Sequence, residues 1–285
     1  MSTAGPPEAV CDPWEPPSGS DQPAVPGPHP RPLSRRGGLF PIPALTPVPP
    51  PGPAAPPHRW GLGAYLLVEA VFLTASVLLV LPYAGRHTVT PPPVMLLLSL
   101  AVPSVLAAGV AVLVTWLRGN GPRIDLGLRF DRSDLVWGLV FGGCGLALTV
   151  PAAAVWSWVV GPEQANSAVA ELFAGRRFDA PLAIGVFLVV SLLAPVCEEI
   201  VYRGLLWGAV CRHVPNRWWA FGLTTLCFAL AHFEFTRTPL LLVIAVPIGL
   251  ARLYTGRLGA SIIAHQLNNL LPAVSLLLVL MGVPV

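Results

Sequence analysis

The sequence predicts an all-α protein, a polytopic bundle of about seven transmembrane helices that follows a disordered proline-rich tail. The first observation is composition: the 285 residues are 54% hydrophobic and only 11% charged, with a mean hydropathy of +0.68. That balance excludes an ordinary soluble domain. The second observation is that apolar segments of roughly 20 residues recur from Trp60 onward, the length of a helix that crosses a ~30 Å hydrocarbon layer.

The tail covers residues 1–58, where 19 of the 34 prolines fall. Proline lacks an amide donor and fixes φ, so this segment forms neither helix nor sheet. We interpret it as a solvated cytoplasmic tail, with docking to an SH3-like partner through polyproline II conformation as the alternative. It has no basic start followed by a short apolar core, so we expect no cleavable signal peptide.

The spans are expected to be helices because each is apolar all round, whereas a barrel strand would alternate over about ten residues. Two N-terminal helices form the segment 59–119, and the remaining spans follow from residue 120 onward. The short pair of segments after residue 217 has the weakest signal. The expected spans are 62–83, 93–117, 134–159, 181–208, 218–233, 239–254 and 259–281.

The arginines predict an orientation. With the amino terminus inside, twelve arginines fall in inner segments and four in outer ones, which favours a cytoplasmic amino terminus and an exterior carboxyl terminus. The outer four are Arg86, Arg176, Arg177 and Arg237; the inner twelve are Arg31, Arg35, Arg36, Arg59, Arg118, Arg123, Arg129, Arg132, Arg212, Arg217, Arg252 and Arg257. The net charge of +3 is too small and too scattered for nucleic-acid binding.

The fourth span contains charged residues in the stretch CEEIVYRG. A charge at bilayer depth costs about 2.5 to 3.5 kcal/mol, so each one requires a partner. Glu199 and Arg203 are spaced i,i+4 and are expected to pair on one helix face. Glu198 lies about 100° further round the helix. Its partner must therefore come from another helix. Glu69 in the first span has no obvious partner.

Later spans offer such partners. His232 ends an apolar run, with Phe228 one turn earlier, and His265 and Asn269 are spaced i,i+4 in the last span. Counted from the inner arginines, Glu198 and these polar residues lie about 12 to 22 Å deep, so they can meet in one plane. Taken singly, a histidine could be an ordinary interfacial residue, the Glu/Arg pair could be purely structural, and the asparagine could only join two helices by a hydrogen bond. Together on three helices they indicate a chemical site.

These residues carry three motifs in order: EExxxR in CEEIVYRG, FxxxH in FALAH and HxxxN in HQLNN. The pattern resembles the CAAX-protease and bacteriocin-processing family of intramembrane proteases, which includes the type II CAAX prenyl endopeptidase. The resemblance covers roughly residues 120–280, with DLGLRF at 125–130 similar to the family's lead-in. It implies an intramembrane catalytic domain at 120–285.

The resemblance also implies peptide-bond hydrolysis in or at the membrane. Glu198 would act with His232 to activate water, His265 and Asn269 would stabilise the oxyanion, and Glu199 and Arg203, with Phe228, would support the site. The residues agree, because a carboxylate removed from water binds a proton more readily and donors in low dielectric stabilise an oxyanion strongly. No serine or cysteine is needed as nucleophile, and Cys197 is expected to be filler.

A metal is the open question about cofactors. Glu198, His232 and His265 would make a plausible set of ligands for a divalent metal such as zinc. The chain has no HExxH motif, and a metal-free glutamate mechanism fits the same residues. The five cysteines have no CxxC spacing and are expected to be free thiols.

The predicted function is therefore an endopeptidase of the bacterial plasma membrane that acts on a membrane-anchored protein or peptide substrate within the lipid bilayer. One alternative is a catalytically silent membrane scaffold or a bacteriocin self-immunity protein. Another is a proton-coupled transporter, but no inverted repeat of broken helices supports it. An intact set of four site residues argues against a silent scaffold.

Overall fold

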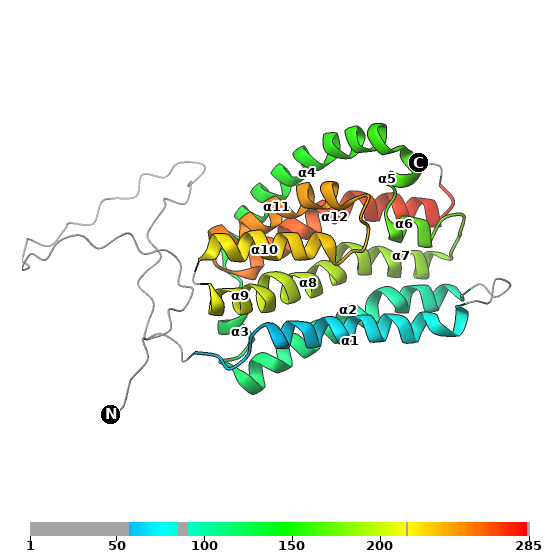
Figure 1. Ribbon diagram of the computed structural model, residues 1–285. Helices are drawn as coiled ribbons and strands as arrows, with labels where there is room; N and C mark the ends of the chain where they lie inside the picture. Colours follow the sequence, from blue (N-terminus) through cyan, green and yellow to red (C-terminus); the bar gives the residue numbers. More distant parts are fainter. Residues whose placement is uncertain (1–56, 85–90, 215, 284–285) are drawn as a thin grey trace, which may run out of the picture. The chain divides into compact units, whose positions relative to one another are not determined.

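The computed structural model describes residues 57–84, 91–214 and 216–283, and in this part of the chain all regular secondary structure is helical (Figure 1). The all-α prediction is confirmed. The tail predicted at 1–58 lies outside the described residues, apart from its last two.

Fifteen helical elements follow one another in these residues. The short ones are η1 Leu81–Tyr83, α3 Pro122–Asp125, α5 Pro162–Ala165 and α6 Ala168–Leu172. The long ones are α1 Leu62–Val80, α2 Pro93–Arg118, α4 Arg132–Val160, α10 Arg217–Leu230, α11 Thr238–Thr255 and α12 Leu258–Leu280. The remaining elements form one continuous helical segment: α7 Ala180–Leu188, η2 Val189–Leu193, α8 Ala194–Glu199, η3 Ile200–Leu206 and α9 Trp207–His213.

Six helical segments of the described chain are long and apolar enough to cross a membrane, so the protein is an integral membrane protein. They correspond to six of the seven predicted spans. The seventh, expected at 218–233, is α10, which is helical but has only 14 residues. At 1.5 Å per residue α10 reaches about 21 Å and falls short of a ~30 Å hydrocarbon layer.

Local signals in the sequence account for several helix ends. Asp131 caps α4 in a capping box: its side chain accepts a hydrogen bond from the Ser133 amide, and Asp134 accepts one from the Asp131 amide. Helix α11 ends at Gly256, whose φ of 67° is left-handed and favours glycine.

Helix α4 packs against α11 and α12, while α1 packs against α2 and both contact η3. The contact of α4 with α12 is close because it uses glycines: a Cβ on Gly142 would lie 2.9 Å from Leu267 Cδ2 and 3.1 Å from Ala264 Cα. Small residues allow helices in a membrane to approach in this way. At one end of the pair, Arg257 forms an ion pair with the buried Asp134.

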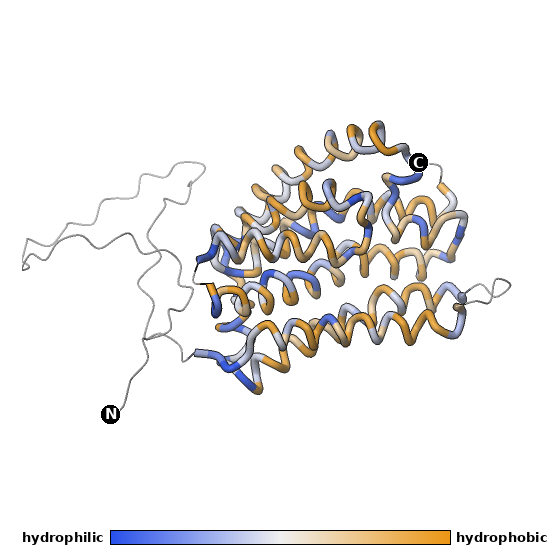
Figure 2. Tube along the Cα trace, viewed as in Figure 1, coloured by the Kyte–Doolittle hydropathy of each residue, from blue (hydrophilic) through white to orange (hydrophobic). Residues whose placement is uncertain are grey.

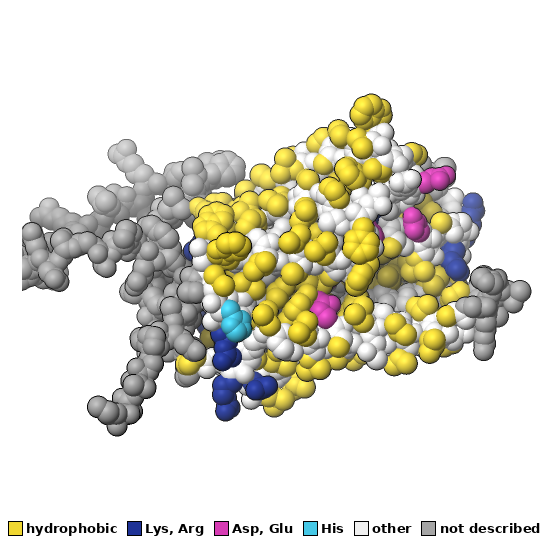
Figure 3. Space-filling model, in the orientation of Figure 1, with side chains coloured by type: hydrophobic (Ala, Val, Ile, Leu, Met, Phe, Trp, Pro, Cys, Tyr) yellow, Lys and Arg dark blue, Asp and Glu magenta, His cyan; other side chains and the backbone are white. Residues whose placement is uncertain are grey.

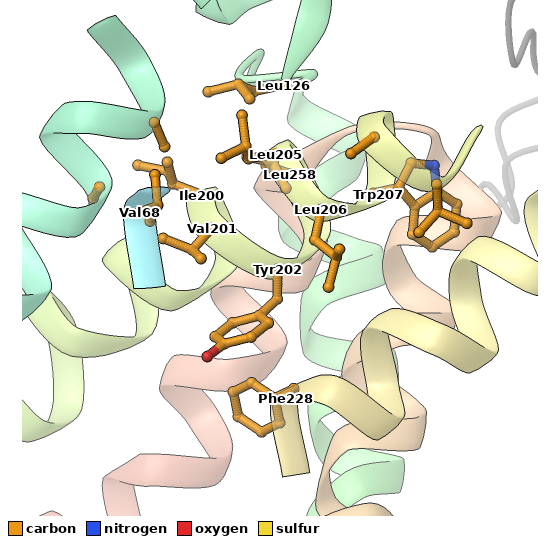
Figure 4. Packing of buried hydrophobic residues seen from close by; sticks show 14 of the residues in the cluster. Val68, Leu126, Ile200, Val201, Tyr202, Leu205, Leu206, Trp207, Phe228 and Leu258 are labelled. Atoms are coloured by element: carbon orange, nitrogen blue, oxygen red, sulfur yellow. The ribbon is translucent and has the colours of Figure 1, made fainter. Parts of the chain in front are cut away.

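The largest buried cluster surrounds η3 (Figure 4), where Tyr202, Leu205 and Leu206 pack with Phe228 of α10. Outside this core, apolar side chains are exposed, as lipid contact requires. In α1, for example, Leu66 and Leu78 are exposed. Figure 2 shows hydrophobic residues along the helices, and Figure 3 shows hydrophobic side chains over most of the visible face.

One sequence expectation, about the cysteines, needs correction. Cys144, Cys197 and Cys227 are free thiols as expected, but Cys211 is disulfide-bonded. Arg252, counted among the inner-side arginines, is buried in the last turn of α11. Its Nε donates a 3.0 Å hydrogen bond to the carbonyl oxygen of Arg203. Its role is therefore to satisfy backbone carbonyls inside the bundle.

Candidate active site

The two glutamates lie in a helix with unusual geometry. Glu198 and Glu199 end the short α-helical segment α8, and π-helical segments precede and follow it. Pro195, the second residue of α8, has no amide donor, so regular i→i−4 bonding cannot continue there. Short π-helical segments are rare and occur frequently at functional sites. The local backbone thus marks the region of the two carboxylates.

Glu199 and Arg203 form the ion pair that their spacing predicts. Arg203 Nη1 lies 2.9 Å from Glu199 Oε1, and both side chains are 0% exposed. A second contact comes from α12, where His265 Nδ1 lies 2.9 Å from the same oxygen. Because an ion-paired carboxylate only accepts hydrogen bonds, Nδ1 of His265 carries a hydrogen. Glu199 therefore links Arg203 of its own helical segment to His265 of α12.

Glu198 has a different environment, although it is the adjacent residue. Its side chain is 28% exposed, and its Oε2 lies 3.6 Å from His265 Nε2. The expected partner from another helix is thus His265. His265 stands between the two glutamates, with Nδ1 toward Glu199 and Nε2 toward Glu198. Glu199 is thus ion-paired inside the bundle through Oε1, whereas Glu198 is partly exposed and has only the long contact to His265.

His232 lies in the turn after α10 and is oriented by its own helix. Its Nδ1 makes a 2.8 Å hydrogen bond to the Phe228 carbonyl oxygen. Since a carbonyl only accepts, Nδ1 is the donor, and Nε2 makes no hydrogen bond with the residues that the structure describes. The structure does not join His232 to Glu198 by a hydrogen bond or an ion pair, although the sequence predicted that they act together.

Phe228 organises these groups. Its ring centroid lies 4.8 Å from that of His232 and 5.4 Å from that of His265, both edge-on. The Arg203 guanidinium lies over the same ring at 4.3 Å, a cation–π contact. Phe228 is buried. It therefore fixes both imidazoles and the supporting arginine around one aromatic side chain.

Asn269 faces the π-helical segment before α8. Its Nδ2 donates a 3.1 Å hydrogen bond to the Val190 carbonyl oxygen, and one turn earlier Gln266 Nε2 donates to the Leu192 carbonyl at 3.3 Å. Asn268 instead binds the carbonyl oxygens of Ala264 and Gly142 at the α4 contact. Asn269 thus lies on the same face as His265, one helical turn away, while Asn268 is a packing residue.

The possible zinc set is not assembled. Within the residues described, no group of three His, Cys, Asp or Glu side chains is arranged to hold a metal ion. His265 and Glu198 are neighbours, but Nδ1 of His265 is bonded to Glu199 and Nδ1 of His232 is bonded to the Phe228 carbonyl oxygen. The residues therefore do not fit a three-ligand metal site, and the chemistry is derived from the side chains alone.

The DLGLRF segment, residues 125–130, contacts the start of α12, the helix that carries His265. Gly127 has a φ of 66°, and a Cβ there would overlap with Nη1 of Arg252. Its carbonyl oxygen accepts a hydrogen bond from the amide of Leu258, the first residue of α12. The glycine is required both for its left-handed conformation and for the close approach of Arg252. The lead-in thus helps to fix the start of the helix that carries His265.

The sequence analysis missed one cluster beside the site. Tyr202, four residues after Glu198, packs edge-on against Phe228 at 5.5 Å, and Tyr65 of α1 packs edge-on against Tyr202 at 6.2 Å. Glu69 of α1 interacts with both tyrosines. The i,i+4 spacing of Glu198 and Tyr202 could have indicated Tyr202. Nothing in the sequence indicates that α1 reaches it.

Comparison with known proteins gives two matches. A family model for type II CAAX prenyl endopeptidase Rce1-like proteins matches residues 180–271, which include all three motifs. The chain is 27% identical over 171 residues to the membrane-embedded CAAX protease MroQ of Staphylococcus aureus (strain USA300), an alignment that covers 58% of this chain and 68% of that protein. No solved structure gives a significant match.

The fold and the site define the class: an integral membrane protein in which glutamate and histidine side chains from separate helices meet among apolar spans. The resemblance to the CAAX-protease and bacteriocin-processing family that the three motifs predicted is confirmed by both matches.

Proposed function

We propose that the protein is an endopeptidase that hydrolyses a peptide bond of a membrane-associated or C-terminal peptide substrate. The observation that carries the proposal is the contrast between the two glutamates. Glu199 is buried and its Oε1 contacts both Arg203 and His265, whereas Glu198 is part exposed and has one long contact to His265. A carboxylate that is kept reactive among apolar helices is costly unless it has a function.

In the proposed reaction Glu198 is the general base. A water molecule loses a proton to the Glu198 carboxylate as its oxygen bonds to the substrate carbonyl carbon, which gives a tetrahedral oxyanion. The protonated Glu198 then gives this proton to the leaving nitrogen as the C–N bond breaks. The products are a new carboxyl terminus and a new amine. No covalent bond to the protein forms.

His232 and His265 have separate parts in this proposal. His232, whose Nε2 makes no hydrogen bond within the described chain, accepts a hydrogen bond from the attacking water and orients it. His265 donates from Nε2 to the oxyanion. In this role His265 is an imidazolium with a hydrogen on each ring nitrogen. Glu199 faces Nδ1 and Glu198 faces Nε2, so two carboxylates offset its charge. Asn269, one turn along α12, supplies a second donor.

The test is cleavage of quenched-fluorescence hydrophobic and isoprenylated peptides by the purified protein in lipid nanodiscs. Wild type is compared with His232→Ala and with Glu163→Gln, an exposed acid on α5 as the matched control. We expect cleavage by wild type and the control, incorporation of one 18O from labelled water into the new carboxyl terminus, and a loss of roughly 10²–10⁴-fold in His232→Ala.

Two further results decide the alternatives. Activity that is unchanged by a chelator supports the metal-free reaction, and loss of activity that added zinc restores would contradict it. If the folded wild-type protein cleaves no peptide and also fails on extracts of bacterial membrane proteins, the scaffold or self-immunity function replaces the protease proposal.

A further inference from the structure

Glu69 is an acid in the apolar helix α1 whose carboxylate is incompletely satisfied. Its Oε1 atom is buried and has no hydrogen-bond partner, and no ion pair to Glu69 occurs among the residues described. A carboxylate at bilayer depth costs about 2.5 to 3.5 kcal/mol on insertion scales unless a partner offsets it. The missing partner of Oε1 must be a donor, since a carboxylate oxygen only accepts.

The neighbours of Glu69 come from three helices. Tyr65 precedes it by one turn on α1, Tyr202 belongs to η3, and Cys227 belongs to α10; all three side chains interact electrostatically with its carboxylate. None of them carries a positive charge at neutral pH. The Glu69 carboxylate is therefore surrounded by polar groups but lacks a cation.

Tyr202 connects this carboxylate with the proposed catalytic base. It interacts with Glu69 on α1 and with Glu198, four residues earlier on its own helical segment. Figure 4 shows its ring beside Phe228, with the hydroxyl directed away from Leu205 and Leu206. Glu69, Tyr202 and Glu198 thus form one polar strip across the helices, which we call the acidic strip.

The acidic strip has two carboxylates and no arginine of its own. Arg203, the cation nearest in sequence, is committed to Glu199. Because charges attract strongly in a medium of low dielectric constant, the strip favours a positively charged group. It also reaches the surface of the bundle, because the Glu198 side chain is 28% exposed.

We propose that Glu69 forms a substrate subsite that receives the cationic side chain of a lysine or arginine near the scissile bond. This inference rests on the proposed peptidase function and deepens it. The cation would supply the donor that Oε1 lacks and would offset the charge of the strip. Glu69 lies on α1, outside the segment 180–271 that matches the family model. Selection of a cationic substrate would then depend on a helix outside that matched segment.

The experiment measures binding rather than turnover. Fluorescent hydrophobic peptides that are identical except for lysine or norleucine at successive positions are titrated onto the Glu198→Gln protein in nanodiscs, with and without Glu69→Gln. We expect one lysine position to bind at least tenfold more tightly than norleucine, and Glu69→Gln to reduce that ratio to less than twofold. Ser76→Ala, elsewhere on α1, is the matched control and should leave the ratio unchanged.

A lysine-to-norleucine ratio below twofold at every position would overturn the proposal, and so would a preference that persists in Glu69→Gln. If Glu69→Gln fails to fold, Glu69→Asp, which keeps the charge, must retain a lysine preference of at least threefold. Because binding is measured without cleavage, this result is separate from the peptidase test, which fails only when the wild-type protein does not hydrolyse peptides.

Discussion

At the scale of single residues, Glu198 and Glu199 differ in environment because adjacent helix positions point about 100° apart. Glu199 turns inward to Arg203 and His265, and its side chain is 0% exposed, whereas that of Glu198 is 28% exposed. The i,i+4 spacing was sufficient to predict the Glu199–Arg203 pair from the sequence. It could not predict that His265 lies between both glutamates, since that depends on how α12 meets α8.

His232 also shows that residue spacing does not predict contacts between helices. The sequence placed it one turn after Phe228, and the Phe228 contact is present at 4.8 Å between ring centroids. Its predicted partnership with Glu198 has no direct contact in the structure. A histidine in a turn after a helix is positioned by the loop that follows, and no spacing rule determines that loop. That a water molecule bridges His232 and Glu198 stays a prediction.

Asn269 provides a residue-scale test with a matched control. We expect Asn269→Ala to lower kcat by roughly 10²–10³-fold, because it removes one of the proposed oxyanion donors, and to change KM little. Gln266→Ala removes an amide that also donates to a carbonyl of η2 but lies one turn earlier on α12. It should retain kcat within about threefold of wild type. Equal losses in both variants would mean that Asn269 only supports the backbone of η2.

At the scale of elements, the sequence predicted six spans well because each is a long apolar run. It predicted α10 poorly, because Ala231, His232 and Phe233 continue the apolar pattern of LTTLCFAL although the helix ends at Leu230. The π-helical segments η2 and η3 were not predicted either. Apolar composition does not distinguish i→i−4 from i→i−5 hydrogen bonding, and only Pro195 hinted at an interruption.

The α4–α12 contact gives an element-scale prediction. We expect Gly142→Ala to destabilise the protein by about 1–3 kcal/mol, because overpacking a close contact forces backbone or side chains to shift. Gly143→Ala adds the same methyl group where nothing lies within 4 Å. It should be neutral or stabilise by up to about 1 kcal/mol, since alanine is the better helix former. Reversible unfolding in mixed micelles measures both, and similar effects would contradict this packing.

At the scale of the whole molecule, hydrogen bonds join several segments that the arginine distribution predicts to lie on the inner side. The amide of Arg59 donates to the carbonyl oxygen of Arg118, Arg212 donates to that of His58, and Arg217 donates to that of Leu253. Figure 1 shows the described chain beginning at this end of the bundle and finishing at the other. The described chain therefore traverses the bundle an odd number of times, with the short α10 as one passage.

The arginine distribution then predicts which end is cytoplasmic. A reporter enzyme that is active only outside the cytoplasm should be active when fused at the carboxyl terminus and inactive when fused after Gly256, in the turn between α11 and α12. The reverse pattern would contradict the orientation. Activity at neither position or at both would show that α12 does not cross the membrane.

The central claim is that Glu198, and not its buried neighbour, is the base that activates water. The most direct measurement is the initial rate of peptide cleavage by folded Glu198→Gln relative to wild type, since this substitution keeps the side-chain shape and removes the proton acceptor. We predict a decrease of roughly 10²–10⁴-fold with the melting temperature preserved. Cleavage by Glu198→Gln within tenfold of the wild-type rate would contradict the account.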